Sequence, residues 1–176
     1  VLGAIRDRAA LDRLDPGRVA EATAPVRETL SRLRRELPPQ TTLLGFAGSP
    51  FTVACYMVEG SGSREFAITR QMALTEPALF DALMDKLTEA TAEMLIGQVE
   101  AGAEAVRRFD SWAGLLPPSQ FRRYVIAPTR RIVKRLREAY PTLKIIGFPR
   151  LAGIMAAEYA RETCVDALAC DTSVDM

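Results

Sequence analysis

The sequence predicts an α/β fold built on a parallel sheet, and three observations support this prediction. Four short apolar segments have the length and composition of buried strands: residues 43–47, 104–109, 143–148 and 165–170. Longer segments with apolar residues at helical spacing lie between them. No linker, repeat or low-complexity segment interrupts the 176 residues. Strands that alternate with helices favour one parallel sheet with right-handed crossovers.

The predicted helices begin and end at recognisable residues. Asp15-Pro16 provides a cap and a first-turn proline, and helical spacing then continues to Leu37. Pro25 is expected to bend or split this helix. Residues 48–60 are predicted to form a long, Gly-rich and apolar loop. Further helices are expected over four ranges: residues 66–73, 76–100, 117–136 and 152–162.

The number of strands leaves two architectures open. A closed (β/α)₈ barrel needs eight strands and usually about 250 residues. Four strands therefore indicate either a complete small doubly wound sheet or about half of a barrel. No Gly-rich phosphate-binding fingerprint joins a strand to its following helix, which argues against a nucleotide-binding fold.

Composition and charge exclude several classes of function. The net charge of +1 gives no electrostatic argument for binding nucleic acid or an acidic membrane, and no run of eighteen apolar residues predicts a membrane span. The three cysteines match no zinc or redox spacing, so reduced thiols are expected. The chain has no His, which removes Ser-His and Cys-His dyads and His-metal sites. Because no initiator Met is present, residues are expected upstream.

Polar side chains follow each predicted strand, where a parallel α/β fold carries its site. In strand order they are Ser49, Thr52 and Tyr56; Asp110, Ser111 and Trp112; Pro149 and Arg150; and Asp171, Thr172 and Ser173. An apolar, aromatic surface of Phe46, Phe51 and Trp112 is expected beside them. Hydroxyls, carboxylates and a guanidinium around such a surface suit a large, flat, carboxylated ligand better than a small sugar.

Four motifs make the chain resemble one known family. Their sequences are GFAGSPFT at residues 45–52, YMVEG at 56–60, FDSWAG at 109–114 and GFPR at 147–150. In order and spacing they are similar to the successive βα-loop motifs of uroporphyrinogen decarboxylase. The resemblance covers residues 5–175, and the last motif is the weakest of the four.

This resemblance implies part of a (β/α)₈ TIM barrel, about strands three to six with their helices. Residues 1–176 would form a single partial domain that lacks the N-terminal and C-terminal barrel units. The family removes four acetate carboxyls from uroporphyrinogen III, giving coproporphyrinogen III in haem biosynthesis. It implies a homodimeric, cytoplasmic lyase without cofactor or metal, with a tetrapyrrole substrate and no nucleic-acid or membrane partner.

The resemblance implies substrate-binding roles for Tyr56 and Ser111. A phenol and a hydroxyl can position a carboxylate by hydrogen bonds, but neither is acidic enough to be the main proton source. The family's central Asp and its paired arginines would lie upstream, and its active-site His downstream. No catalytic residue is therefore assigned within this chain, which is expected to be inactive alone.

The chain also departs from the family pattern. Arg107 and Arg108 stand where a Gln and an apolar residue are usual, and one of two adjacent strand residues should face the barrel and the other the helices. An unpaired buried Arg would be costly. Leu151 and Cys164 stand where Gly is usual, and each is expected to strain a turn that needs positive φ.

Simpler roles remain open for the strand-end residues. Tyr56 or Trp112 could only pack, Ser111 or Asp171 could only cap a turn or helix, and Arg150 could form a surface ion pair. Asp110 is expected to be a structural hydrogen-bond acceptor. Two rival functions are also open. One is a related corrinoid or thiol methyltransferase with a zinc site; the other is a non-catalytic binding domain on the same scaffold.

Overall fold

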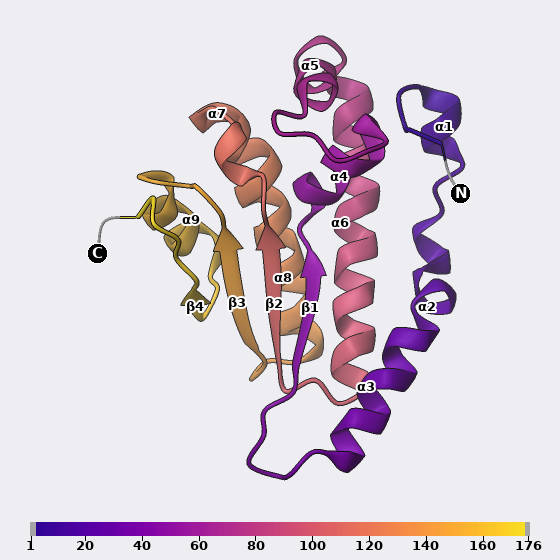
Figure 1. Ribbon diagram of the computed structural model, residues 1–176, viewed down its shortest axis with the longest axis vertical. Coiled ribbons are helices and arrows are strands. Elements are labelled where there is room, and N and C mark those ends of the chain that lie inside the picture. Colours follow the sequence, from indigo (N-terminus) through magenta and orange to yellow (C-terminus); the bar gives the residue numbers. More distant parts are fainter. Residues whose placement is uncertain (1–2, 175–176) are drawn as a thin grey trace.

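The computed structural model describes residues 3–174, which form a four-stranded parallel sheet covered by helices (Figure 1). The strands lie in the order β1-β2-β3-β4, which is also their order in the sequence. Their bounds are β1 Leu44–Gly48, β2 Ala105–Asp110, β3 Lys144–Pro149 and β4 Ala167–Leu168. The predicted α/β class and parallel sheet are therefore confirmed.

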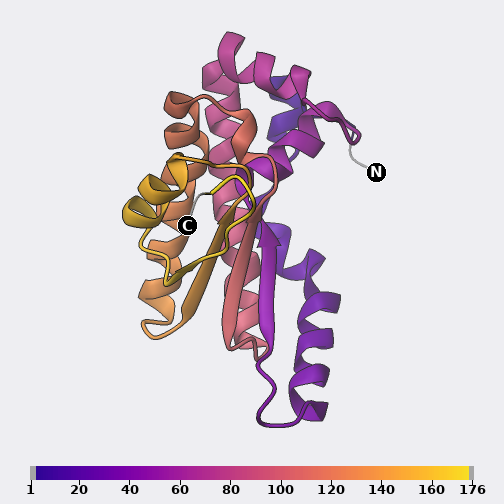
Figure 2. The ribbon, with the colours of Figure 1, turned by 60° about the vertical axis from the view of Figure 1, so that its left-hand side comes forward.

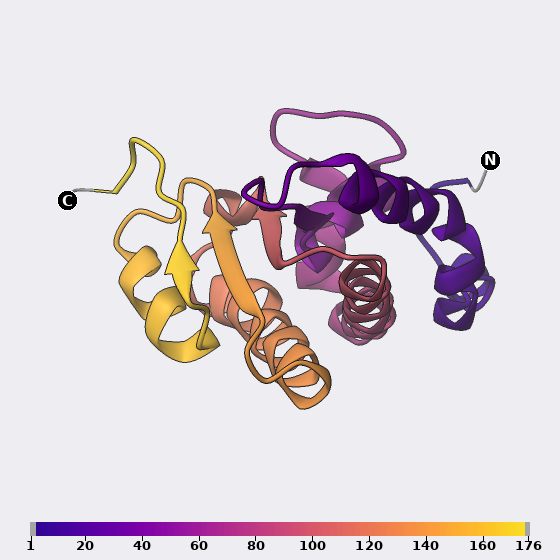
Figure 3. The ribbon, with the colours of Figure 1, turned by 90° about the horizontal axis from the view of Figure 1, so that it is seen from below.

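The helices decide between the two architectures that the strand count left open. The crossovers use α6 (Pro77–Glu100), α8 (Ala127–Ala139) and α9 (Met155–Thr163). Viewed from below, all three lie on the same side of a curved sheet (Figure 3). A doubly wound sheet would carry helices on both faces and reverse its strand order. Sequential strands with helices on one face are instead the arrangement of a barrel wall.

Burial alternates along the strands, as expected when one face packs on helices and the other is open. Ala47, Val106 and Ile145 are 3%, 0% and 0% exposed and face the helices. On β1, Leu44 and Phe46 alternate with Ala47 and are 46% and 62% exposed. The face that carries Leu44 and Phe46 is called the concave face below, and the helix-covered face is called the convex face.

The N-terminal segment forms several short helices before the sheet begins. They are α1 (Arg8–Asp12), the 3₁₀ turn η1 (Pro16–Arg18), α2 (Val19–Ala22) and α3 (Ala24–Glu36). The expected split at Pro25 is confirmed, because α2 ends at Ala22 and Pro25 lies in the first turn of α3. Helix α3 and the loop after it lie at the end of the sheet opposite the arrowheads (Figure 2).

The predicted loop over residues 48–60 is wrong, because most of it is helix α4 (Pro50–Glu59). Pro50 lies in the first turn, and Gly60 ends the helix in the left-handed conformation with φ of 81°. Phe51, Ala54, Cys55 and Val58 are each 0% exposed and follow helical spacing. The glycines that suggested a loop border this helix and do not interrupt it. Helix α5 (Ala67–Thr75) follows it.

The remaining elements complete the crossovers. They are the 3₁₀ turn η2 (Ala113–Leu115), α7 (Pro118–Phe121) and a π-helical turn, η3 (Arg122–Ile126), which leads directly into α8. The fourth strand is shorter than the predicted 165–170, because only Ala167 and Leu168 pair with β3. Within residues 3–174, no helix is both long and apolar enough to cross a membrane.

Candidate functional site

The carboxyl ends of the strands lie together at one end of the sheet, beside α4, α5 and α7 (Figure 1). Two hydrogen bonds join the first two strand ends. The Ser49 amide donates to the Phe109 carbonyl at 2.8 Å, and the Thr52 hydroxyl donates to the Asp110 carboxylate at 2.9 Å. The structure thus brings the GFAGSPFT and FDSWAG motifs into direct contact, although they are about sixty residues apart in the sequence.

Tyr56 lies on α4 one turn after Thr52, so it shares the face of the helix that meets Asp110. Its side chain packs edge-on against Phe66 and Trp112, with ring centroids 5.4 and 6.4 Å away. The residue is nevertheless 46% exposed. Within residues 3–174 the Tyr56 hydroxyl makes no hydrogen bond.

Ser111 is half-buried and follows Asp110 directly. Its carbonyl accepts a hydrogen bond of 3.4 Å from the Arg150 side chain, while the Arg150 amide donates to the Asp110 carbonyl at 3.0 Å. The Gly114 amide donates back to the Arg150 carbonyl at 3.1 Å. A Cβ at Gly114 would lie only 2.4 Å from the Leu151 carbonyl oxygen, so only glycine allows this close approach of the two loops.

Asp110 is 1% exposed and turned away from solvent. Burial raises the pKa of Asp110 to about 6, against the opposing effects of the Thr52 hydrogen bond and the positive charge of Arg108. One carboxylate oxygen has no hydrogen-bond partner within the described residues. The geometry agrees with the predicted role of Asp110 as a structural acceptor that holds α4 against β2.

A hydrogen bond joins Leu151, which follows β3, to Asp171, which follows β4. The Asp171 carboxylate accepts hydrogen bonds from the Leu151 amide at 2.5 Å and the Ser173 amide at 2.8 Å, which gives it the turn-stabilising role that the sequence left open. The expected strain is confirmed, since Leu151 has φ of 58° and Cys164, at the end of α9, has φ of 56°. Phe66 also has positive φ, at 47°, which the sequence did not predict.

The concave face carries an aromatic row that sequence analysis missed. The rings of Phe46, Phe109 and Phe148 lie on three neighbouring strands, and each adjacent pair has centroids 6.0 Å apart with edge-on geometry. The expected grouping of Phe46 with Phe51 and Trp112 is wrong, because Phe51 is fully buried in the core. Phe109 pairs with Phe148, whereas Phe46 pairs with Arg107, two residues before Phe109, and this register could not be read from the sequence.

Arg107 lies on the concave face in contact with this aromatic row, and Arg108 lies on the opposite face. The Arg107 guanidinium carbon is 4.5 Å from the centre of the Phe109 ring and 5.1 Å from that of Phe148. Arg108 is 0% exposed, and one of its nitrogens donates to Thr129 at 2.6 Å and Tyr159 at 3.0 Å. The predicted division of the two arginines between the faces is confirmed. Two further Arg108 nitrogens are buried without a partner in the described part of the chain.

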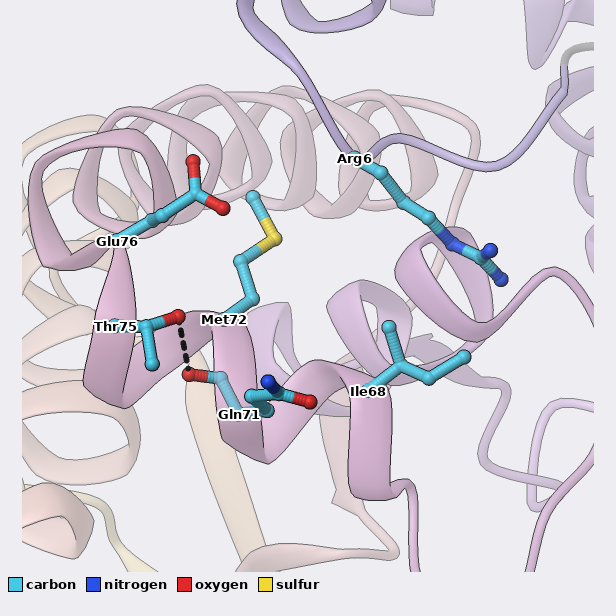
Figure 4. Close-up of a pocket in the computed structure, with 6 residues that line it drawn as sticks. All are labelled: Arg6, Ile68, Gln71, Met72, Thr75 and Glu76. Carbon is cyan, nitrogen blue, oxygen red and sulfur yellow. Dashed lines mark hydrogen bonds between the residues drawn. The ribbon is translucent and has the colours of Figure 1, made fainter.

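A separate surface pocket lies between α5 and the N-terminal segment (Figure 4). Its lining residues are Arg6, Ile68, Gln71, Met72, Thr75 and Glu76. With a volume of about 190 Å³ it is smaller than the range of roughly 300–1,000 Å³ that is typical of ligand sites. It includes none of the predicted site residues.

Over residues 3–174, no three Cys, Asp or Glu side chains are grouped as a metal site would need.

Comparison with known proteins identifies the family to which this geometry belongs. The family model for uroporphyrinogen decarboxylase (URO-D) matches residues 1–176. The chain belongs to the uroporphyrinogen decarboxylase family. A uroporphyrinogen decarboxylase of Gluconobacter oxydans is 70% identical over 99% of the chain, and one of Gluconacetobacter diazotrophicus is 63% identical over all of it. These matches cover 50% and 53% of the relatives, so the chain spans about half the length of the curated relatives it matches.

A solved structure supports the barrel architecture of this URO-D family chain. A methyltransferase from Methanosarcina mazei superposes with a TM-score of 0.60 at 16% sequence identity. The superposition covers 95% of the chain and 51% of the methyltransferase. This likeness concerns the fold alone, and together with the sequential parallel sheet it is consistent with part of a (β/α)₈ barrel.

Proposed function

We propose that the protein containing this chain is a uroporphyrinogen decarboxylase, a carbon–carbon lyase that removes the acetate carboxyls of uroporphyrinogen III. The observation that carries the proposal is the URO-D family match over residues 1–176, in a sheet whose strand ends present the hydroxyls of Tyr56 and Ser111. An apolar, aromatic surface with hydrogen-bond donors at its edge suits a large carboxylated ring. Tyr56 and Ser111 are the proposed substrate-binding residues.

The reaction chemistry fits this division of roles. Loss of CO₂ from a pyrrole acetate leaves an electron pair, and protonation of the pyrrole ring provides a place for it. The site must then supply an acid and hold the carboxylates still. Tyr56 and Ser111 can hold a carboxylate by hydrogen bonds. The acid is not Asp110, because its carboxyl is buried and bonded to Thr52. We therefore expect the 176-residue chain alone to be inactive.

Several finer expectations belong to the same proposal. Residues 1–176 would form one partial barrel domain, corresponding to about strands three to six of eight. The full protein would be a cytoplasmic homodimer. Three free cysteines, Cys55, Cys164 and Cys170, support a reducing compartment, because disulfides are rare there. The dimer follows from the family resemblance and is tested by measuring the molar mass of the longer protein in solution.

The test is a decarboxylation assay on the longer protein that carries these residues. Replacing Tyr56 by Phe or Ser111 by Ala should lower kcat/KM about tenfold or more, because each change removes a hydrogen bond to a charged carboxylate. Tyr140→Phe, on a half-buried tyrosine at the end of α8, is the matched control and should leave kcat/KM unchanged. Equal rates in all four proteins would contradict the assignment of the two hydroxyls.

Two further measurements separate the rival functions. The isolated 176-residue chain should give no coproporphyrinogen, and measured turnover would refute the expected inactivity. Metal analysis of the longer protein addresses the methyltransferase alternative, which requires bound zinc. A stoichiometric zinc content together with no loss of CO₂ would favour that alternative over a decarboxylase.

A further inference from the structure

One buried hydrogen bond lies next to both proposed substrate-binding residues. The Thr52 hydroxyl donates to the Asp110 carboxylate at 2.9 Å, and the two residues are 7% and 1% exposed. Tyr56 follows Thr52 by four residues on α4, so the two side chains share one face of the helix. Ser111 directly follows Asp110, the last residue of β2. The bond therefore joins the helix that carries one hydroxyl to the strand end that carries the other.

The remaining hydrogen bonds of α4 hold it to other parts of the fold. The Arg6 side chain donates to the carbonyls of Val58 and Glu59, each at 2.9 Å. The Thr69 amide, on α5, donates to the Glu59 carboxylate at 3.3 Å. Among the residues that the structure describes, no side-chain hydrogen bond other than that of Thr52 joins α4 to β2. The position of α4 relative to the end of β2 therefore depends on this bond and on apolar packing.

Apolar packing and the hydrogen bond restrain α4 in different ways. The fully buried apolar side chains of α4 fix which face of the helix meets the core. Apolar burial is non-directional, whereas a hydrogen bond weakens steeply when its atoms are displaced. At a rise of about 1.5 Å per residue, Tyr56 lies about 6 Å from Thr52 along the helix axis. A shift of α4 at Thr52 would therefore move Tyr56 relative to Ser111 by a similar amount.

We propose that Thr52 and Asp110 are positioning residues, which fix the placement of Tyr56 relative to Ser111 during decarboxylation. The inference rests on the proposed function, because it assumes that these two hydroxyls hold the substrate. It goes further by assigning a part in the reaction to a buried pair that touches no ligand. Elements of this chain bury both partners of the bond, so the pair is complete without the rest of the barrel.

The test compares the steady-state kinetics of variants of the longer protein, with uroporphyrinogen III as the substrate. Thr52→Val keeps the shape of the side chain but removes the donor. It should lower kcat/KM about three- to tenfold, because a misplacement of about 1 Å can cost up to about 100-fold. Thr52→Ser restores a hydroxyl and should recover most of the loss.

Thr88→Val is the matched control for the loss of a buried threonine hydroxyl. Thr88 is 1% exposed, and its hydroxyl donates to the Met84 carbonyl of its own helix at 2.7 Å. The substitution has the same chemistry as Thr52→Val but breaks no bond between elements. It should leave kcat/KM unchanged.

A double-mutant cycle separates positioning from a general loss of stability. If Thr52 acts through Tyr56, adding Thr52→Val to Tyr56→Phe should change kcat/KM less than about twofold, because coupled residues have non-additive effects. A purely structural role would lower the rate by the same factor in both backgrounds. Thermal unfolding of each variant sets an assay temperature at which all of them are folded.

The outcomes decide the inference separately from the proposed function. A loss in Thr52→Val, recovered in Thr52→Ser and absent in the Tyr56→Phe background, supports the inference. An equal loss in Thr88→Val, or the same loss in both backgrounds, overturns it. If wild type and Thr52→Val decarboxylate equally well, the inference fails while the proposed function stands. If the wild-type protein releases no CO₂, the proposed function fails and the positioning role fails with it.

Discussion

Two neighbouring arginines have opposite environments on the two faces of the sheet. Arg108, on the convex face, is completely buried beneath α8 and α9 and bonds to Thr129 and Tyr159. Arg107, on the concave face, is half-buried and stacks on phenylalanine rings without a polar partner. The difference shows that the convex face is specified by packing. The concave face has no covering element among residues 3–174, as expected for the inner side of a partial barrel wall.

The largest expected effect contrasts adjacent residues of β3. A Cβ at Gly147 would lie 2.6 Å from the Tyr159 ring and 2.7 Å from its hydroxyl, on a side chain that is fully buried. Gly147→Ala should therefore lower the free energy of unfolding by about 3 kcal/mol and displace Tyr159 from Arg108. Phe148→Ala, on the concave face, should cost only about 1 kcal/mol, because the ring is already half-exposed. Urea unfolding measures both, and similar losses would contradict the contrast between the faces.

The next effect is a pH dependence that originates on the convex face. The folded-state pKa of Asp110 is about 6, above its ordinary value of 3.8, so the folded protein holds this proton more tightly than the unfolded chain. Stability from this group is therefore greatest below pH 4 and falls as the pH rises from about 4 to 6. The size of the fall is about 3 kcal/mol.

Asp110→Asn should remove this contribution while keeping an oxygen that accepts the Thr52 hydrogen bond. Unfolding free energies measured between pH 4 and 7 should then fall less steeply in the variant than in the wild type. The same slope in both proteins would show that the carboxyl does not titrate in this range. Asp171→Asn is a control, because its pKa is lowered by the Ser173 and Leu151 hydrogen bonds and it titrates below this window.

The smallest effect compares the stability of the two arginine variants. Arg108→Met replaces an incompletely bonded buried charge by an apolar chain of similar length, which should be neutral or stabilise the fold by about 1 kcal/mol. Arg107→Gln loses a cation–π contact and should cost less than about 1 kcal/mol. Thermal unfolding measures both shifts. A large loss of stability in Arg107→Gln would contradict this expectation, because it would mean that Arg107 stabilises the fold. A large loss of stability in Arg108→Met would contradict the expectation for the convex face.

Sequence patterns predicted most of the architecture because they reflect local rules. Alternating strands and helices and the split at Pro25 follow from residue type and spacing. The positive φ of Leu151 and Cys164 was expected from the family resemblance, in which Gly is usual at both positions. Helix α4 was missed for a physical reason. Its ten residues are mostly apolar and border glycines, so no amphipathic pattern distinguished it from a loop until burial of Phe51 and Val58 was known.

The candidate site was predictable only in part. Tyr56 and Ser111 could be named from motifs, and their positions at the strand ends agree with a site there. The row of Phe46, Phe109 and Phe148 could not be assembled, since it depends on the register between strands that are distant in sequence. A shift of one residue would move each ring to the other face.

The sequence by itself determined that this protein has a parallel α/β fold of the URO-D family, with Arg107 and Arg108 on opposite faces. Those properties follow from local periodicity and motif identity. Only the tertiary structure decided which arginine is buried, that Asp110 is held by Thr52, and that three phenylalanines form one surface. Each of these three features depends on contacts between residues that are far apart in the chain. Strand register and burial determine such contacts, and residue type alone does not.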